Sequence, residues 1–118
     1  MKSIIFMLLA VAIINLKKCP VINAGQAKRY VGKEVILRDR MIRSGNSSYA
    51  QSAWFEVGKD TSHTLMVFIQ GNLYQNQTAK TSIKNYIGKI IEVKGIVQND
   101  KSVYLNATDT IKLSAVQY

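Results

Sequence analysis

A motif that occurs twice decides the fold of this chain. The first copy is Arg29-Tyr30-Val31-Gly32-Lys33-Glu34-Val35-Ile36-Leu37. The second copy is Asn85-Tyr86-Ile87-Gly88-Lys89-Ile90-Ile91-Glu92-Val93. Each copy places a tyrosine, a β-branched residue, a glycine and a lysine before a run that favours a strand. Glycine tolerates the positive φ at which many helices end. The motif therefore predicts two strands of one sheet, each entered from a short helical or turn segment.

Alternation of apolar and polar residues predicts further strands around these two copies. They are expected over residues 53–57, 64–70 and 102–113. The polar stretch 75–86 carries apolar residues at helical spacing, so a short helix is expected there. Turns are expected at 44–48, where Ser, Gly and Asn cluster, and at 99–101. The predicted order is three strands, a helix and two strands.

This order is typical of the OB-fold, and the motifs resemble those of bacterial OB-fold nucleic-acid-binding domains. The resemblance is carried by Tyr30-Val31-Gly32-Lys33, Trp54-Phe55-Glu56-Val57-Gly58, Leu65-x-Val67-x-Ile69 and Gly88-Lys89-x-Ile91-x-Val93-x-Gly95-x-Val97. It covers residues 21–113. It implies an all-β, five-stranded Greek-key OB-type barrel with one short helix between strands 3 and 4. It also implies a ligand face on the second and third strands.

Strand periodicity sorts the side chains of this expected face, because successive residues point to opposite sides. Trp54 is expected to point outward, with Phe55 inward; the reverse assignment is the alternative. The third strand is expected to expose Met66, Phe68 and Gln70. Phe68 packed over one end of the barrel is the alternative for that residue. Exposed aromatic rings are the surfaces on which single-stranded nucleic acids stack their bases.

Three arginines are the candidate contacts for phosphate groups. Arg38 and Arg40 fall on one face of the first strand, and Arg43 follows in the predicted loop. A solvated, charged edge that prevents strand pairing is the alternative interpretation. The candidate nucleic-acid-binding residues are therefore Trp54, Phe68, Arg38, Arg40, Arg43, Met66 and Gln70.

The composition narrows the classes of function. The chain has 118 residues, enough for one domain, and sixteen Lys and Arg against seven Asp and Glu give a formal charge of +9. A basic protein of this kind favours anionic partners. One cysteine and one histidine argue against a disulfide or a metal centre built from those residues. With His63 in a polar loop and no convincing nucleophile, we expect no enzyme, no cofactor and no metal.

Residues 1–24 have the pattern of a targeting segment. Lys2 precedes an apolar run over residues 4–16, which is short for a membrane span. A secretory signal is expected, with cleavage after Ala24 as one option; an uncleaved anchor or a buried helix is the alternative. Leu16-Lys17-Lys18-Cys19 lacks the small residues of a lipoprotein signal, which argues against a lipid anchor at Cys19.

Residues 25–118 are then expected to form a single exported domain, periplasmic or secreted. Removal of the segment takes away three of the sixteen basic residues and no acid, which leaves a charge of +6. Two functions follow from these observations. One is an OB-fold module that binds single-stranded DNA or RNA through an aromatic and basic face. The alternative is an exported envelope adaptor that binds protein or oligosaccharide, since OB-folds also take oligosaccharides. Neither includes a membrane-embedded domain.

Overall fold

The computed structural model describes residues 19–117 except residues 48 and 61. The expected apolar signal at residues 4–16 lies outside these described residues. Within them, no helix has the length and apolarity needed to cross a membrane.

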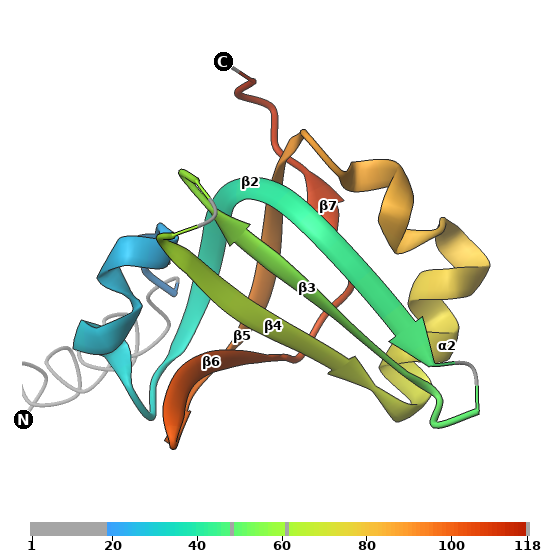
Figure 1. Ribbon diagram of the computed structural model, residues 1–118, viewed down its shortest axis with the longest axis horizontal. Helices are drawn as coiled ribbons and strands as arrows, with labels where there is room; N and C mark the ends of the chain where they lie inside the picture. Colours follow the sequence, from blue (N-terminus) through green and yellow to red (C-terminus); the bar gives the residue numbers. More distant parts are fainter. Residues whose placement is uncertain (1–18, 48, 61, 118) are drawn as a thin grey trace, which may run out of the picture.

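Five strands close a barrel, which Figure 1 shows from the side. They pair in the order β2 (Glu34–Ser47), β3 (Ser52–Gly58), β4 (Thr64–Gln70), β6 (Ser102–Ala107) and β5 (Ile90–Asp100), and β5 pairs back with β2. These pairings are antiparallel except β4 with β6, which is parallel. Two short strands pair alongside the barrel strands. β1 (Val21–Ile22) pairs parallel with β2, and β7 (Lys112–Leu113) pairs antiparallel with β5. The predicted five-stranded Greek-key barrel is confirmed; β1 is an added strand that alternation did not predict.

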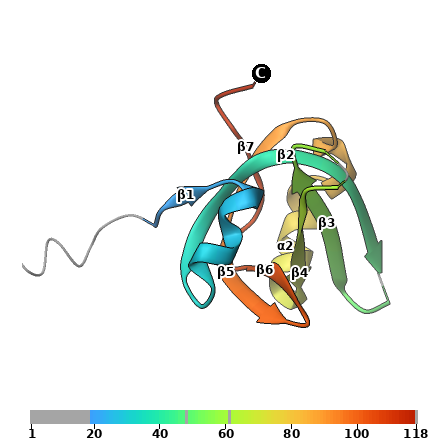
Figure 2. The same ribbon diagram turned by 60° about the vertical axis from the view of Figure 1, so that its left-hand side comes forward.

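Helical segments lie at opposite ends of the barrel (Figures 1 and 2). The 3₁₀ helix η1 (Ala24–Tyr30) contacts every barrel strand from one end, and α2 (Gly71–Lys80) packs on β3 and β4 at the other. A second 3₁₀ helix, η2 (Ile83–Tyr86), follows α2. The expected short helix between the third and fourth barrel strands is therefore confirmed. Its predicted bounds are wrong, because α2 begins at Gly71 and the extended backbone of Thr81 and Ser82 separates it from η2.

The two copies of the repeated motif adopt the same local structure. Gly32 follows η1 and Gly88 follows η2, with φ angles of 83° and 87°. These angles lie in the left-handed region that favours glycine. The strands that follow pair antiparallel with each other, from Glu34 opposite Ile96 to Arg40 opposite Ile90. The prediction of two strands of one sheet with similar glycine entries is confirmed, and the structure shows in addition that the two strands are direct neighbours.

Two predictions about segment ends are wrong. Residues 44–47 were expected in a loop, but they belong to β2 because a bulge between Met41 and Arg43 bends the strand and lets it continue along β3. Arg43 is consequently a strand residue. The strand expected over residues 102–113 is divided, since β6 ends at Ala107 and β7 begins at Lys112.

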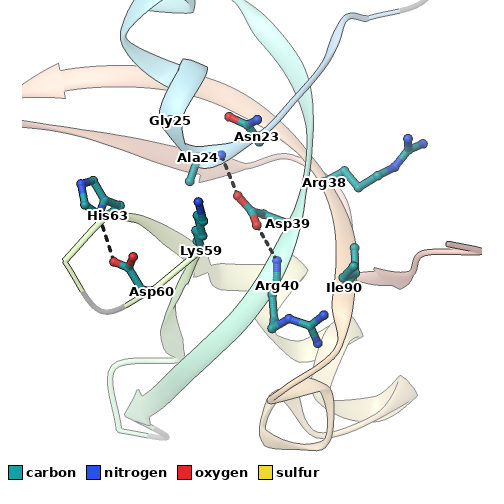
Figure 3. A pocket seen from close by; sticks show the side chains of 11 residues that line it. Asn23, Ala24, Gly25, Arg38, Asp39, Arg40, Lys59, Asp60, His63 and Ile90 are labelled. Carbon is teal, nitrogen blue, oxygen red and sulfur yellow. Dashed lines mark hydrogen bonds and ion pairs between the residues drawn. The ribbon is translucent and has the colours of Figure 1, made fainter. Parts of the chain in front are cut away.

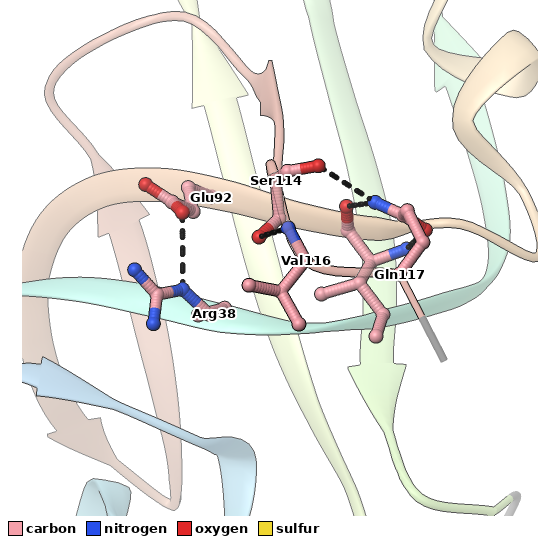
Figure 4. A network of polar contacts seen from close by, with 6 residues as sticks. Arg38, Glu92, Ser114, Val116 and Gln117 are labelled. Atoms are coloured by element: carbon pink, nitrogen blue, oxygen red, sulfur yellow. Dashed lines mark hydrogen bonds and ion pairs between the residues drawn. The ribbon is translucent and has the colours of Figure 1, made fainter.

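The core follows the predicted alternation on the central strands. Its members Phe55, Val57, Leu65, Val67 and Ile69 are 0–4% exposed. The carboxyl-terminal segment is bound to β5 through Gln117, whose side-chain amide forms two hydrogen bonds with the backbone of Ile90. The Ile90 N–H donates to Gln117 Oε1 at 2.9 Å, and Gln117 Nε2 donates to the Ile90 carbonyl at 2.7 Å. Figure 4 shows the accompanying hydrogen bond from the Val116 N–H to Ser114 Oγ, 3.2 Å long.

Candidate functional site

The outer face of the barrel across β2, β3, β4 and β6 is built from two rows of cross-strand partners. The first row is Gly45, Trp54, Phe68 and Asn106. The second row is Arg43, Glu56, Met66 and Tyr104. Their neighbours Phe55, Val67 and Leu105 are fully buried, so these eight residues lie on the opposite, outward side. We refer to the eight residues as the outer face.

Three aromatic side chains lie on the outer face, each on a different strand. Trp54 and Phe68 are direct partners on β3 and β4, and both are partly exposed. The rings of Phe68 and Tyr104 form an edge-to-face contact with centroids 5.3 Å apart and planes at 88°. The structure thus brings together Trp54, Phe68 and Met66 from the predicted set. Gln70 is exposed at the end of β4, two residues beyond Phe68.

An ion pair lies in the second row. Arg43 Nη2 donates to Glu56 Oε1 at 2.9 Å, and this hydrogen bond raises the pKa of Arg43 above its usual value. The Arg43 side chain is 60% exposed and that of Glu56 is 9% exposed. Glu56 is therefore on the outward side, as alternation predicts, yet it is buried between its partners on β2 and β4. The pair reduces the positive charge that Arg43 presents to a ligand.

Arg38 and Arg40 lie elsewhere, on the part of β2 that pairs with β5. Arg38 forms an ion pair with its partner Glu92 at 3.0 Å, and Arg40 donates to the carbonyl of Gly88. The bulge at Met41 separates both arginines from the rows of the outer face. The structure accordingly groups Arg43 with the aromatic rings, while Arg38 and Arg40 line a separate cleft.

This cleft has a volume of about 640 Å³ and lies between η1, β2 and the loop that joins β3 to β4. Asp39 connects η1 to β2 at this cleft. Its carboxylate accepts hydrogen bonds from the backbone N–H groups of Ala24, at 2.9 Å, and of Arg40, at 2.8 Å. In Figure 3, Arg38 and Arg40 point to one side of Asp39, and Lys59 lies on the other. Lys59 makes no hydrogen bond or ion pair with the residues that the structure describes.

The loop after β3 also carries the single histidine. Asp60 Oδ1 accepts hydrogen bonds from the Ser62 hydroxyl and backbone N–H and contacts His63 Nδ1 at 3.0 Å. These hydrogen bonds, that of the Ser62 hydroxyl first, hold the pKa of Asp60 well below its usual range. His63 is therefore held in an exposed turn by the contacts of its Nδ1 with Ser62 and Asp60. In the described part of the chain, no three His, Cys, Asp or Glu residues are grouped so as to hold a metal ion.

Tyr104 and Lys59 are site residues that sequence reasoning did not select. A signal for Tyr104 was present, because it lies in the strand expected over residues 102–113, where alternation places it on the side opposite to the apolar Leu105. The contact of Tyr104 with Phe68 depends instead on the parallel pairing of β4 with β6, which joins segments far apart in the sequence.

Comparisons with known proteins identify the fold. No family model and no curated protein matches the chain. The OBody AM1L10, solved bound to hen egg-white lysozyme, has a TM-score of 0.61 at 15% identity over 84% of this chain and 97% of the OBody. The OB4 domain of the yeast telomere protein Cdc13 has a TM-score of 0.54 at 11% identity, over 79% of this chain and 89% of that domain.

A third similar structure belongs to a larger protein, of which this chain matches only a part. Aspartyl-tRNA synthetase from Entamoeba histolytica has a TM-score of 0.57 at 16% identity over 76% of this chain. The match spans 20% of the synthetase. Similarity at such low identity establishes the fold alone. The chain therefore has an OB-fold, as its sequence motifs indicated.

Proposed function

We propose that this protein is a non-catalytic OB-fold module that binds single-stranded nucleic acid on its outer face. The observation that carries the proposal is the placement of Trp54, Phe68 and Tyr104 on the same face of three adjacent strands, all partly exposed. Each base stacked on such a ring contributes about 1–3 kcal/mol and needs no particular sequence. Because the rings stand on paired strands, little conformational freedom is lost when a ligand stacks on them.

Basic side chains beyond the rings supply contacts for the phosphate groups. Arg43 lies on the outer face opposite Glu56, and Arg40 on β2 and Lys59 just after β3 line the cleft. Arg43 and Arg38 already share their charge with Glu56 and Glu92. We therefore expect a shallow salt dependence, because the slope grows with the number of phosphates neutralised and is roughly 0.7 per phosphate for a single strand.

A protein ligand is the second candidate, with an oligosaccharide as a further form of the same adaptor function. The internally paired charges of Arg43 and Glu56 beside aromatic rings and Met66 favour it, since protein interfaces are rich in aromatic residues, Met and Arg. The OBody similar to this chain was solved bound to a protein, lysozyme. In either case, we propose that the protein acts after export.

Fluorescence of Trp54, the single tryptophan of the chain, tests the first candidate. The full chain is titrated with single-stranded oligonucleotides of about 12 nucleotides, within the range of OB-fold site sizes, at low and moderate salt. Saturable quenching that weakens modestly with salt is expected. No spectral change and no binding of a labelled oligonucleotide at either salt would refute nucleic-acid binding and leave the protein ligand as the function to pursue.

A further inference from the structure

Glu56 occupies the centre of the outer face. Trp54 lies two residues before it on the same side of β3, and its direct partners are Arg43 on β2 and Met66 on β4. A base that stacks on Trp54 would place its edge over the next position of the strand, about 7 Å along β3, where Glu56 lies. The carboxylate is thus within reach of the base edge.

The carboxylate has a free acceptor beside a donor. Glu56 Oε1 accepts from Arg43 Nη2, whereas Oε2 has no hydrogen-bond partner among the described residues. Since no fully buried side-chain oxygen or nitrogen of those residues lacks a partner, Oε2 keeps some contact with solvent, although the Glu56 side chain as a whole is only 9% exposed. A carboxylate oxygen accepts two hydrogen bonds, so Oε1 also keeps capacity. Two acceptors therefore lie next to the 60% exposed guanidinium of Arg43.

This pattern discriminates among the four bases. A carboxylate repels phosphate, so in a nucleic-acid site it suits a part of the ligand that donates hydrogen bonds. Guanine alone presents two adjacent donors, N1–H and the N2 amino group, followed by the acceptor O6. Both carboxylate oxygens of Glu56 can accept from those donors while Arg43 donates to O6. Thymine places its single donor between two acceptors, and adenine and cytosine each offer one amino group.

We propose, on the basis of the proposed function, that Glu56 and Arg43 read the Watson–Crick edge of a guanine stacked on Trp54. Glu56 is then the residue that determines base preference. Hydrogen bonds to an ionised acceptor are the strong ones, and recognition of single strands through the Watson–Crick edge is common. The preference arises at one position of the bound strand, so a single guanine suffices.

The test compares a thymine oligonucleotide with three derivatives that carry one central guanine, adenine or cytosine. The full chain is expected to bind the guanine derivative about tenfold tighter than the others, the effect of one good hydrogen-bonded base contact. The variant Glu56→Gln is expected to lose this difference while it still binds the all-thymine strand. Glu92→Gln is the matched control, because Glu92 forms a similar ion pair with Arg38 away from the rings.

Equal affinities of the full chain for all four strands would overturn the guanine assignment while leaving nucleic-acid binding in place. Persistence of the guanine preference in Glu56→Gln would assign it to another residue. Binding of none of the strands would refute the proposed function together with this inference. The comparison of strands uses the unchanged protein, so the test holds even if Glu56→Gln lowers stability.

Discussion

Gly45 and Trp54 are direct partners on β2 and β3, and the indole ring lies against the glycine backbone. A Cβ atom at Gly45 would lie 2.7 Å from Cε2 and Cζ2 of the indole. Carbon atoms do not approach so closely, so any side chain at this position must displace the ring. Gly45 therefore determines where the Trp54 ring lies on the outer face, and with it the position at which we propose that a base stacks.

Gly45→Ala is expected to move the indole, to change the emission of Trp54 and to weaken oligonucleotide binding. Stability should change by less than about 1 kcal/mol, because alanine suits a strand interior better than glycine and the displaced ring is at the surface. Emission spectra and chemical denaturation measure both effects. Emission identical to that of the parent protein would contradict the close contact.

Gly95→Ala is the matched control for that substitution. Its Cβ would meet the carbonyl oxygen of Asn106 at 2.6 Å and Leu105 Cγ at 2.9 Å, inside the β5–β6 pairing. Backbone cannot move aside as the Trp54 ring can, so we expect a loss of about 1–3 kcal/mol in the free energy of unfolding. The emission of Trp54 in the folded protein should stay unchanged.

Phe68→Ala and Tyr104→Ala are each expected to weaken oligonucleotide binding about fivefold or more, the loss of one stacking partner. The two rings contact each other, so the double variant should lose less than the sum of the single effects. Tyr104→Phe keeps the ring and should bind like the parent. Titrations with a labelled strand provide the affinities. Full binding by both alanine variants would exclude these rings from the interface.

The amino-terminal boundary of the fold is expected to lie before Val21. Ile22 is 3% exposed in β1, and Asn23 caps η1 through its hydrogen bond from the Gln26 N–H. A chain that begins at Gly25 should be less stable than one that begins at Cys19 by about 3 kcal/mol, from one buried isoleucine and one helix cap. Denaturation of the two chains measures this difference. Equal free energies of unfolding for the two chains would contradict this boundary and would mean that cleavage after Ala24 does not destabilise the fold.

Gln77 joins α2 to the segment before β7, although its side chain is fully buried. Its Oε1 accepts the Ile111 N–H at 2.7 Å, and its Nε2 donates to the Thr81 carbonyl at 3.3 Å. Gln77→Ala would leave the Ile111 N–H unpaired in the core, which costs about 1–3 kcal/mol. Gln75→Ala, on the exposed side of the same helix, should change stability little. Similar melting temperatures for both variants would contradict the role of Gln77.

Local patterns predicted much of the fold and part of the site. The alternation of Phe55 and Val57 with Trp54 identified which side of β3 faces the core, because strand periodicity depends only on adjacent residues. The glycines of the repeated motif were predicted for the same reason, since positive φ is a property of a single residue. The bulge after Met41 has no comparable signal, so the course of β2 and the place of Arg43 were not predicted correctly.

The sequence by itself determined the strands, their buried sides and the OB-type order, because each of these follows from propensities and spacings within a few residues. The tertiary structure decided which exposed side chains meet. Tyr104 reaches Phe68 only through the parallel pairing of β4 with β6, and Glu56 neutralises Arg43 only through the shifted register of β2. Register between distant strands is set by closure of the whole barrel around one core, which no short stretch of sequence encodes.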